Sequence, residues 1–426
     1  MNQTSQIIRS QAPVLFELLS ELGRVSEFPA DIPFQAAEAR GKKLNATIGQ
    51  ITDGHGHPIP LPSMASALGS LRDLDRDRAF LYSPVGGVEE LRHLWRDWQR
   101  RGRSSHELSS LPIVTVGLTH GLSLIADLFG GRDRAVAVAR PFWGNYAQTF
   151  RTRTGANILS APAYAAWRFN STAIAEALAG VPPGDPAVAI LNLPSNPGGY
   201  MPTVEEREAI RSSLIEIADQ RPLLVVCDDA YQGLVYEAGI PDESMFWDLS
   251  GAHENLIPVK VDGATKELSY FGGRVGFLTF PFDPESPVAS AIESKVKCLL
   301  RATVGSPVST GQVVAMAALR SSALSTEVGR IRELLGARYR RLKGSLGSLD
   351  PSRVRTLPFN AGCFTLLELE SAVDGSAELM RQRLLSEYDV GLISIAPNYL
   401  RIAFCSIDEE AIPELVRKIG LALEGI

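Results

Sequence analysis

Lys266 has the sequence position best suited to nucleophilic chemistry. The chain has eight lysines, and the other seven lie among polar or charged neighbours, which is typical of solvated surface lysines. Lys266 instead follows the predicted strand VKVDGAT and precedes a Gly-Gly-Arg turn that ends at Arg274. In open α/β sheets, ligands bind at the carboxyl ends of the strands. We therefore expect Lys266 in a binding crevice, and a surface-loop lysine is the alternative.

Three further polar signatures directly follow predicted buried strands. They are RPFW at 140–143, NLPSNPGG at 192–199 and DDAY at 228–231. They offer an indole, an amide, a carboxylate and a phenol to the sheet edge where we expect Lys266. Pyridoxal phosphate uses all of these groups, because its aldehyde forms a Schiff base with a lysine amine and its ring accepts electrons. The pattern therefore predicts a pyridoxal phosphate site.

These motifs, taken in order, resemble those of the fold type I pyridoxal-phosphate-dependent aminotransferases, the aspartate aminotransferase superfamily of class I and II. The resemblance runs from about Gly49 to Arg401. Its parts are the loop from Asn192 to Gly199, the strand end DDAY, and Lys266 with Arg274 eight residues later. It implies transfer of an amino group between an L-amino acid, such as aspartate, glutamate or an aromatic one, and a 2-oxo acid such as 2-oxoglutarate.

The resemblance also assigns roles around the cofactor ring. Lys266, Asp228 and Tyr231 would be the catalytic residues, with Asp228 keeping the ring nitrogen protonated. Tyr231 and Asn196 would hydrogen-bond the phenolic oxygen and lower the pKa of the Schiff base. Trp143 would stack on the ring. Alternatives are a turn cap for Asn196 and a core tryptophan for Trp143, and Asp229 is expected to be structural.

The phosphate end of the cofactor is less clearly marked. The turn after the strand at 113–116 offers backbone amides at a helix start, which suits an anion, and an arginine suits a dianion. The resemblance further implies that a tyrosine reaches the phosphate from a second copy, and hence a homodimer. The expected residues are Gly117, Leu118, Thr119, Thr265, Arg274 and, from the second copy, Tyr82. The family often has serine where this chain has Gly263. The sequence therefore does not show which hydroxyl, that of Thr119 or that of Thr265, contributes more to phosphate binding.

Substrate binding follows from the resemblance at four positions. Arg401 would pair with the α-carboxylate, and Gly49 would approach the same carboxylate with its backbone, although a simple turn glycine is an equal alternative. Asn196 would also face the substrate. Arg301 matches a partner-chain arginine that binds a distal carboxylate or serves aromatic substrates, with a helix-surface arginine as the competing interpretation.

The elements that must position these residues are short apolar runs alternating with amphipathic stretches. Predicted strands are 113–116, 135–139, 187–193, 223–227, 257–261 and 275–280, with crossover helices that include 122–129 and 205–218. This pattern predicts an α/β fold with a mostly parallel sheet in three layers. An amphipathic segment, 7–22, precedes it.

A second pattern begins near residue 324. A long charged helix over 327–346 is followed by strands at 363–369 and 400–404. We expect a smaller α+β domain there. The predicted division is residues 1–58 as an N-terminal arm and part of the small domain, 59–323 as the large cofactor-binding domain, and 324–426 as the small domain.

The composition argues against several other classes of protein. The 42 Lys plus Arg against 48 Asp plus Glu, without a basic block, argue against nucleic-acid binding. With 45% hydrophobic residues the chain is not disordered, and its apolar runs are far short of the ~20 residues of a membrane helix. Four cysteines without a CxxC motif, and a polar start without a signal peptide, predict the cytoplasm.

Three alternatives compete with the aminotransferase hypothesis. A β-lyase or another biosynthetic enzyme of the same fold would begin with the same Cα deprotonation. A transcription regulator would need a DNA-binding module for which the residues before Gly49 leave little room. A metal site at His55 and His57 lacks a third ligand at useful spacing, so no metal is expected.

Overall fold

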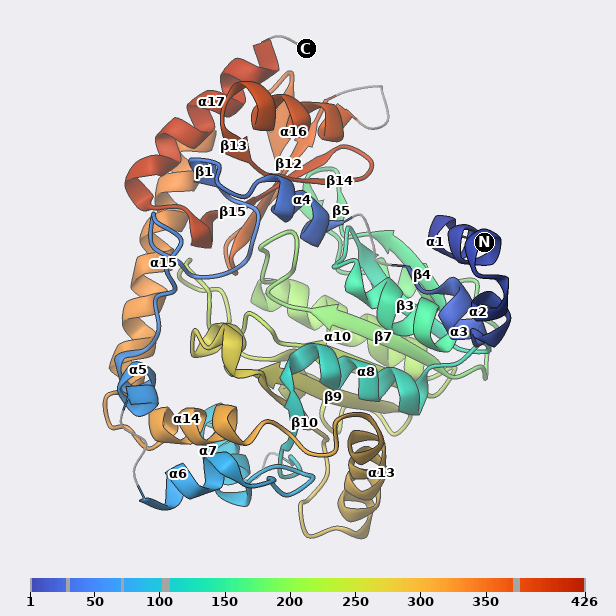
Figure 1. The fold of residues 1–426 in the computed structure, drawn as a ribbon. Helices are drawn as coiled ribbons and strands as arrows, with labels where there is room; N and C mark the ends of the chain where they lie inside the picture. The colour runs from blue at the N-terminus through green and yellow to red at the C-terminus, as the bar shows by residue number, and fades with distance from the viewer. Residues whose placement is uncertain (1, 28–30, 70–72, 102–107, 371–375, 425–426) are drawn as a thin grey trace.

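A seven-stranded sheet lies at the centre of the computed structural model, which describes residues 2–27, 31–69, 73–101, 108–370 and 376–424 (Figure 1). In spatial order its strands are β2 (Ile113–Val116), β10 (Val275–Thr279), β9 (Leu256–Gly263), β8 (Leu223–Asp228), β7 (Ala187–Asn192), β3 (Ala135–Arg140) and β4 (Asn157–Pro162). Only the pairings of β10 with β2 and β9 are antiparallel. The predicted α/β fold is confirmed.

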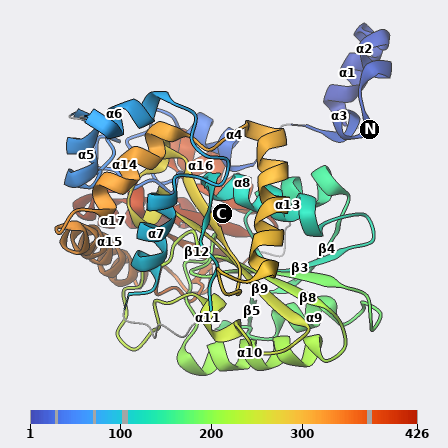
Figure 2. The ribbon, with the colours of Figure 1, turned by 90° about the horizontal axis from the view of Figure 1, so that it is seen from below.

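The central strands are apolar along nearly their whole length and are buried on both faces. β7 reads AVAILN and β8 reads LLVVCD, and almost every residue in them is buried. Figure 2 shows helices on both faces of the sheet. Helices α8 (Gly117–Phe129) and α13 (Pro287–Val304) lie on one side, and α10 (Val204–Ala218) lies on the other. Parallel strands need this double cover.

A second sheet lies beside the first and has its own hydrophobic core. Its strands, in spatial order, are β11 (Val354–Thr356), β12 (Phe364–Leu369), β15 (Tyr399–Ala403) and β14 (Ile393–Ile395). The helices α15 (Leu324–Leu346), α16 (Ser376–Glu387) and α17 (Ile412–Glu424) pack on it, and Leu44 and Ala46 join this core. The exact division at residues 58 and 323 stays a prediction.

The N-terminal segment is broken where we expected one amphipathic element. It forms α1 (Gln3–Gln11), α2 (Pro13–Leu18) and α3 (Glu21–Val25). Pro13 has no N–H and its ring clashes with a preceding helical turn, so it starts a new helix. Figure 2 shows these three helices standing away from the rest of the chain.

The remaining elements are short. The helices are α4 (Ile32–Glu38), α5 (Pro62–Gly69), α6 (Asp73–Phe80), α7 (Glu89–Gln99), α9 (Ala173–Leu178), α11 (Met245–Leu249), α12 (Ala264–Glu267) and α14 (Ser309–Leu319). The short strands are β1 (Leu44–Asn45), β5 (Tyr164–Ala165), β6 (Arg168–Phe169) and β13 (Val390–Gly391). A π-helix spans Ala147–Thr152, and 3-10 turns span Phe271–Gly273, Phe404–Ser406 and Glu409–Ala411. Within the described ranges, no helix is both long and apolar enough to cross a membrane.

Gly199 lies at a close approach between the loop after β7 and the segment before β12. It has φ +71, and a Cβ there would lie 1.9 Å from the carbonyl oxygen of Phe364. The N–H groups of Asn360 and Ala361 both donate to the carbonyl of Gly199. The loop that carries Asn196 is therefore tied to the segment leading into β12.

Gly199→Ala is expected to lower the free energy of unfolding by ~3 kcal/mol, because the added methyl group meets main-chain atoms and the positive φ disfavours it. Urea denaturation measures the change. Gly344→Ala, in α15, is the control: a Cβ there has no neighbour outside its local helix backbone within 4 Å, and alanine favours the helix by up to ~1 kcal/mol. Equal stability of the two variants would contradict the close approach.

Candidate active site

One cavity collects most of the residues that the sequence singled out. It opens beside the carboxyl ends of β7, β8 and β9. Its lining includes Gly49, Leu118, Thr119, Trp143, Asn196, Asp228, Tyr231, Thr265, Lys266, Arg274 and Arg401. Gly117 supports it from behind, since a Cβ there would lie 2.3 Å from the guanidinium of Arg274.

Strand register explains why these residues meet. Asn192, at the end of β7, is paired with Asp228, at the end of β8, and Asp228 is paired with Val261 in β9. The side chain of Asn192 donates to the carbonyl of Asp228 at 3.0 Å and accepts from the N–H of Asn196 at 2.7 Å. The strand ends and the loop at 192–199 therefore form one hydrogen-bonded unit.

Lys266 faces the cavity from α12, directly after β9. Its ammonium group lies 5.1 Å from the centre of the Tyr231 ring. The surrounding protein lowers the pKa of Lys266, because desolvation disfavours the charged form more than the nearby Asp228 favours it. A larger share of the lysine is therefore the neutral amine, the form that attacks a carbonyl.

Asp228 is the buried carboxylate opposite Lys266. It is 2% exposed, and burial raises its pKa. Three groups oppose that rise: the hydroxyl of Tyr146, which donates to Asp228 Oδ2 at 2.5 Å, the charge of Lys266, and the N–H of Ala230. The Asp228 carboxylate is therefore a hydrogen-bond acceptor that is almost fully shielded from water.

Tyr146 holds Asp228 and Trp143 in a fixed relation. It is 1% exposed, and its ring meets the Trp143 ring edge-on with centroids 5.6 Å apart. Burial and the charge of Asp228 raise the pKa of Tyr146, so its hydroxyl keeps the proton that it donates.

The phosphate-end residues also gather in the cavity. Thr265 Oγ1 is buried and, within the described part of the chain, has no hydrogen-bond partner. Arg274 adopts a left-handed backbone conformation with φ 52, which is rare outside glycine and is typical of functional sites. Its side chain lies against the start of α8 at Gly117. An unpaired hydroxyl, a guanidinium and a helix N-terminus together suit a phosphate group.

Gly263 explains the missing serine. A Cβ there would lie 2.5 Å from the carbonyl oxygen of Val275 and 2.9 Å from the Cα of Gly276. Strand β10 therefore approaches β9 too closely for a side chain at this position. Thr265, whose hydroxyl is buried, lines the cavity instead.

Arg401 closes the opposite end of the cavity. It is 2% exposed, and burial lowers its pKa to about 10. Its Nη1 donates to Asn196 Oδ1 at 3.2 Å and its Nη2 to the carbonyl of Thr47 at 2.6 Å. Its Nε is buried and, among the residues described, has no hydrogen-bond partner. A buried cation with a free donor suits a carboxylate ligand.

Gly49 lies beside Arg401. A Cβ there would lie 2.4 Å from the ring of Phe364, whose face the Arg401 guanidinium covers at 4.4 Å. Glycine is therefore required at this position by a ring that supports the arginine.

Two predicted site residues lie outside this cavity. Tyr82 is 96% exposed, and Arg301 is exposed near the end of α13. Neither lines the cavity of its own chain. Both were expected to act from a second copy, and that expectation stays a prediction.

Sequence reasoning was wrong about Lys260 and missed Tyr146. Lys260 was grouped with the surface lysines, yet it is 1% exposed in β9. Its charge is compensated in the interior by acidic residues that include Asp229, which is distant in sequence. Tyr146 stands three residues after Trp143, a helical spacing that would have placed both on one face. Asn192 and Phe364 were also not assigned to the site, although Asn192 opens the recognised loop.

The histidine pair at 55 and 57 has a structural partner. His57 Nδ1 lies 3.0 Å from Asp53 Oδ2. Over the described ranges, no three His, Cys, Asp or Glu side chains are grouped so that they could hold a metal ion.

Comparison with known proteins agrees with this geometry. The family model described as aminotransferase class I and II matches residues 41–419. The chain belongs to this family. It is therefore an enzyme that transfers amino groups, and its cofactor is pyridoxal phosphate.

Individual relatives are distant but span almost the whole chain. A 2-aminoadipate transaminase of Thermus thermophilus is 27% identical over 401 residues, covering 90% of this chain and 92% of that protein. A mitochondrial aspartate aminotransferase of Dictyostelium discoideum is 25% identical over 373 residues, covering 83% of each.

Solved structures share the fold. An aminotransferase from Anaerococcus prevotii has a TM-score of 0.82 at 20% identity, covering 95% of this chain and 98% of that one. An α-aminoadipate aminotransferase from Thermus thermophilus, complexed with N-(5'-phosphopyridoxyl)-L-leucine, has a TM-score of 0.75 at 23% identity, covering 96% and 98%.

Tyr146→Phe is expected to weaken pyridoxal phosphate binding about tenfold, the equivalent of one lost hydrogen bond to a charged group. Because the Tyr146 hydroxyl lowers the pKa of Asp228, its removal raises that pKa further. As pH falls, Asp228 then becomes neutral at a higher pH than in the wild type, so cofactor affinity also declines at a higher pH. Absorbance titration of the apoprotein across a pH series measures both effects.

Tyr200→Phe is the matched control. Tyr200 donates to Glu206 at 2.8 Å, a phenol-to-carboxylate bond that does not line the active-site cavity. Unchanged cofactor affinity in Tyr146→Phe, or the same loss in both variants, would show that the bond to Asp228 does not support the site.

Proposed function

We propose that the chain acts as a homodimeric aminotransferase that exchanges an amino group between an acidic or aromatic L-amino acid and a 2-oxo acid such as 2-oxoglutarate. The observation that carries the proposal is the placement of Lys266, Asp228 and Arg401 around one cavity. An amine, a buried carboxylate and a buried cation are the groups that amino transfer requires from the protein.

Pyridoxal phosphate supplies an electrophilic aldehyde and an electron-accepting ring when it is bound. In the proposal, Asp228 accepts a hydrogen bond from the ring nitrogen, and Tyr231 and Asn196 donate to the phenolic oxygen. Trp143 covers one face of the ring. The fit is supported by the burial of Asp228 and by the bond from Arg401 to Asn196 Oδ1, which leaves the amide N–H₂ group of Asn196 free to point at the ring.

The phosphate is assigned to the other side of the same cavity. Arg274 supplies the charge, Thr265 and Thr119 supply hydroxyls, and the first turn of α8 at Gly117 and Leu118 supplies backbone N–H groups. The unpaired Thr265 hydroxyl supports this assignment.

Lys266 is proposed to hold the cofactor covalently and then to move the α-proton of the substrate. Its lowered pKa supports the second role, because it increases the share of the neutral amine, the form that can accept a proton and return it. Asp228 and Tyr231 complete the catalytic set by fixing the charge at the two ends of the ring.

Arg401 and Gly49 are proposed to orient the substrate α-carboxylate. The nearby wall includes Ile32, Ile48 and Phe364, which suit the apolar part of a side chain. An acidic side chain needs a further cation, and Arg301 of a second copy is proposed for it.

The dimer is supported by an exposed apolar surface around Tyr82. Phe80 is 88% exposed, Leu81 65% and Tyr82 96%. Three adjacent large apolar residues in water are typical of an interaction surface. The cytoplasmic location remains part of the proposal, supported by four cysteines that are all free thiols.

Lys266→Ala is expected to lower the rate of amino transfer about 10³-fold or more, because it removes both the nucleophile and the proton carrier. The measurement is conversion of the bound cofactor to its amine form, with each protein amino acid offered in turn. Lys295→Ala, at an exposed position on α13, is the control and should leave turnover unchanged. Turnover near the wild-type rate in Lys266→Ala would end the proposal, and release of pyruvate and ammonia from a β-substituted amino acid would favour a β-lyase.

Mixing Lys266→Ala chains with Tyr82→Ala chains is expected to restore activity that neither variant has alone. If Tyr82 completes the partner's site, random pairing makes about half of all dimers mixed, and each mixed dimer has one intact site of two, giving about a quarter of wild-type activity. Assay after joint refolding measures it. Activity of the mixture no greater than the sum of the separate variants would contradict a shared site.

A further inference from the structure

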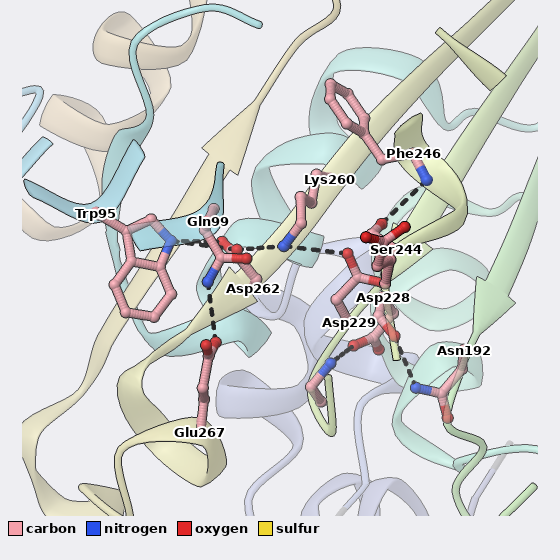
Figure 3. A network of polar contacts seen from close by, with 12 residues as sticks. Trp95, Gln99, Asn192, Asp228, Asp229, Ser244, Phe246, Lys260, Asp262 and Glu267 are labelled. Carbon is pink, nitrogen blue, oxygen red and sulfur yellow. Dashed lines mark hydrogen bonds and ion pairs between the residues drawn. The ribbon is translucent and has the colours of Figure 1, made fainter. Parts of the chain in front are cut away.

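A buried charge network lies next to the active-site cavity but outside its lining (Figure 3). At its centre, Lys260 Nζ contacts Asp262 Oδ2 and lies 3.2 Å from Asp229 Oδ2. Lys260 and Asp262 are each 1% exposed, and Asp229 is 4% exposed. Lys260 and Asp262 stand two residues apart in β9, so their side chains share one face of the strand.

Side chains of helix α7 donate hydrogen bonds to two carboxylates of the network. Trp95 Nε1 donates to both oxygens of Asp262 at 3.2 Å. Trp98 Nε1 and Gln99 Nε2 donate to the two oxygens of Glu267 at 2.6 and 2.9 Å. Positions 95, 98 and 99 follow the helical period, so one face of α7 holds both carboxylates.

Two members of the network are chain neighbours of catalytic residues. Asp229 follows Asp228, and Glu267 follows Lys266. In each pair the first residue lines the cavity and the second does not. The peptide N–H of Asp229 also donates to the carbonyl of Val261, between Lys260 and Asp262. Contacts that hold either network carboxylate therefore restrain the backbone next to a catalytic side chain.

The charge balance of the network depends on Lys260. Among the described residues it is the fully buried cation in contact with these carboxylates. Arg101, the other cation nearby, lies 3.9 Å from Glu267 with its side chain 48% exposed. Burial raises the pKa of Asp229 to about 6 although Lys260 opposes the rise. Without Lys260, Asp229 and Asp262 would lose the buried positive charge that both of them contact, which is strongly unfavourable.

Strand pairing alone does not account for this arrangement. Strand β8 is already joined along its whole length to residues 256–261 of β9 by backbone pairing. Buried ion pairs usually stabilise a fold no more than apolar residues of the same shape. The hydrogen bonds and ion pairs of the network are directional, so they fix the positions of the Asp229 and Glu267 side chains. Apolar contacts are not directional and would fix these positions less.

We propose that Lys260 is a positioning residue: it holds Asp229 directly, and Glu267 through Asp262 and α7, and thereby sets the spacing between Asp228 and Lys266. The inference rests on the proposed function, since those two residues must act on the cofactor. It assigns Lys260 no contact with cofactor or substrate.

Lys260→Met, which keeps the length of the side chain without its charge, tests this role. We expect the variant to fold, to bind pyridoxal phosphate about tenfold more weakly as apoprotein, and to lose kcat by a larger factor than KM changes. The pH midpoint of the bound cofactor's absorbance change should rise, because a nearby positive charge is lost. Circular dichroism, absorbance titration and steady-state kinetics measure these quantities.

Arg381→Met is the matched control, because Arg381 is 2% exposed and pairs with Glu378 and Glu38, and none of the three lines the cavity. It should lower the thermal midpoint without altering cofactor affinity or the absorbance midpoint. If Lys260→Met does not fold, Asp229→Asn, which keeps the shape and removes one charge, should still weaken cofactor binding several-fold.

Two results would overturn the inference: a folded Lys260→Met that binds the cofactor as tightly as the wild type, or equal losses of affinity in Arg381→Met. Neither result affects the proposed function, which fails only if the wild type does not bind pyridoxal phosphate through Lys266.

Discussion

The site depends on one electrostatic constraint: a carboxylate and an amine are held near each other almost out of water. Asp228 and Lys266 each have a pKa displaced toward the neutral form by burial, and each is partly restored by the other. Such a pair is costly, so the fold surrounds it with compensating groups. The hydroxyl of Tyr146 and the N–H of Ala230 both donate hydrogen bonds to Asp228.

The sheet provides the rigidity that this constraint requires. Because β7, β8 and β9 run in parallel and in register, the polar residues at their carboxyl ends lie side by side at one edge of the sheet. Loops alone would leave these side chains mobile. The second sheet then contributes Arg401, and the approach of Gly199 to Phe364 ties it to the loop of Asn196.

Much of this arrangement was predictable from the sequence, for identifiable reasons. The central strands were located to within two residues, because buried parallel strands are continuous apolar runs. Lys260 was misassigned because its partner Asp229 belongs to another strand, and local composition does not reveal a tertiary ion pair. Tyr146 was missed although its helical spacing from Trp143 was visible. The roles expected of Tyr82 and Arg301 stay predictions, because they require a second copy and the structure describes one chain.

The reversed direction of β10 has a geometric consequence for the cofactor pocket. Strand β10 begins, rather than finishes, at the sheet edge where its neighbours finish. A connection of only a few residues therefore links the amine of Lys266 to the guanidinium of Arg274. The connection includes the 3-10 turn Phe271–Gly273. Insertions between 267 and 273 would separate the amine from the guanidinium, the two groups that we propose to anchor the opposite ends of one small molecule.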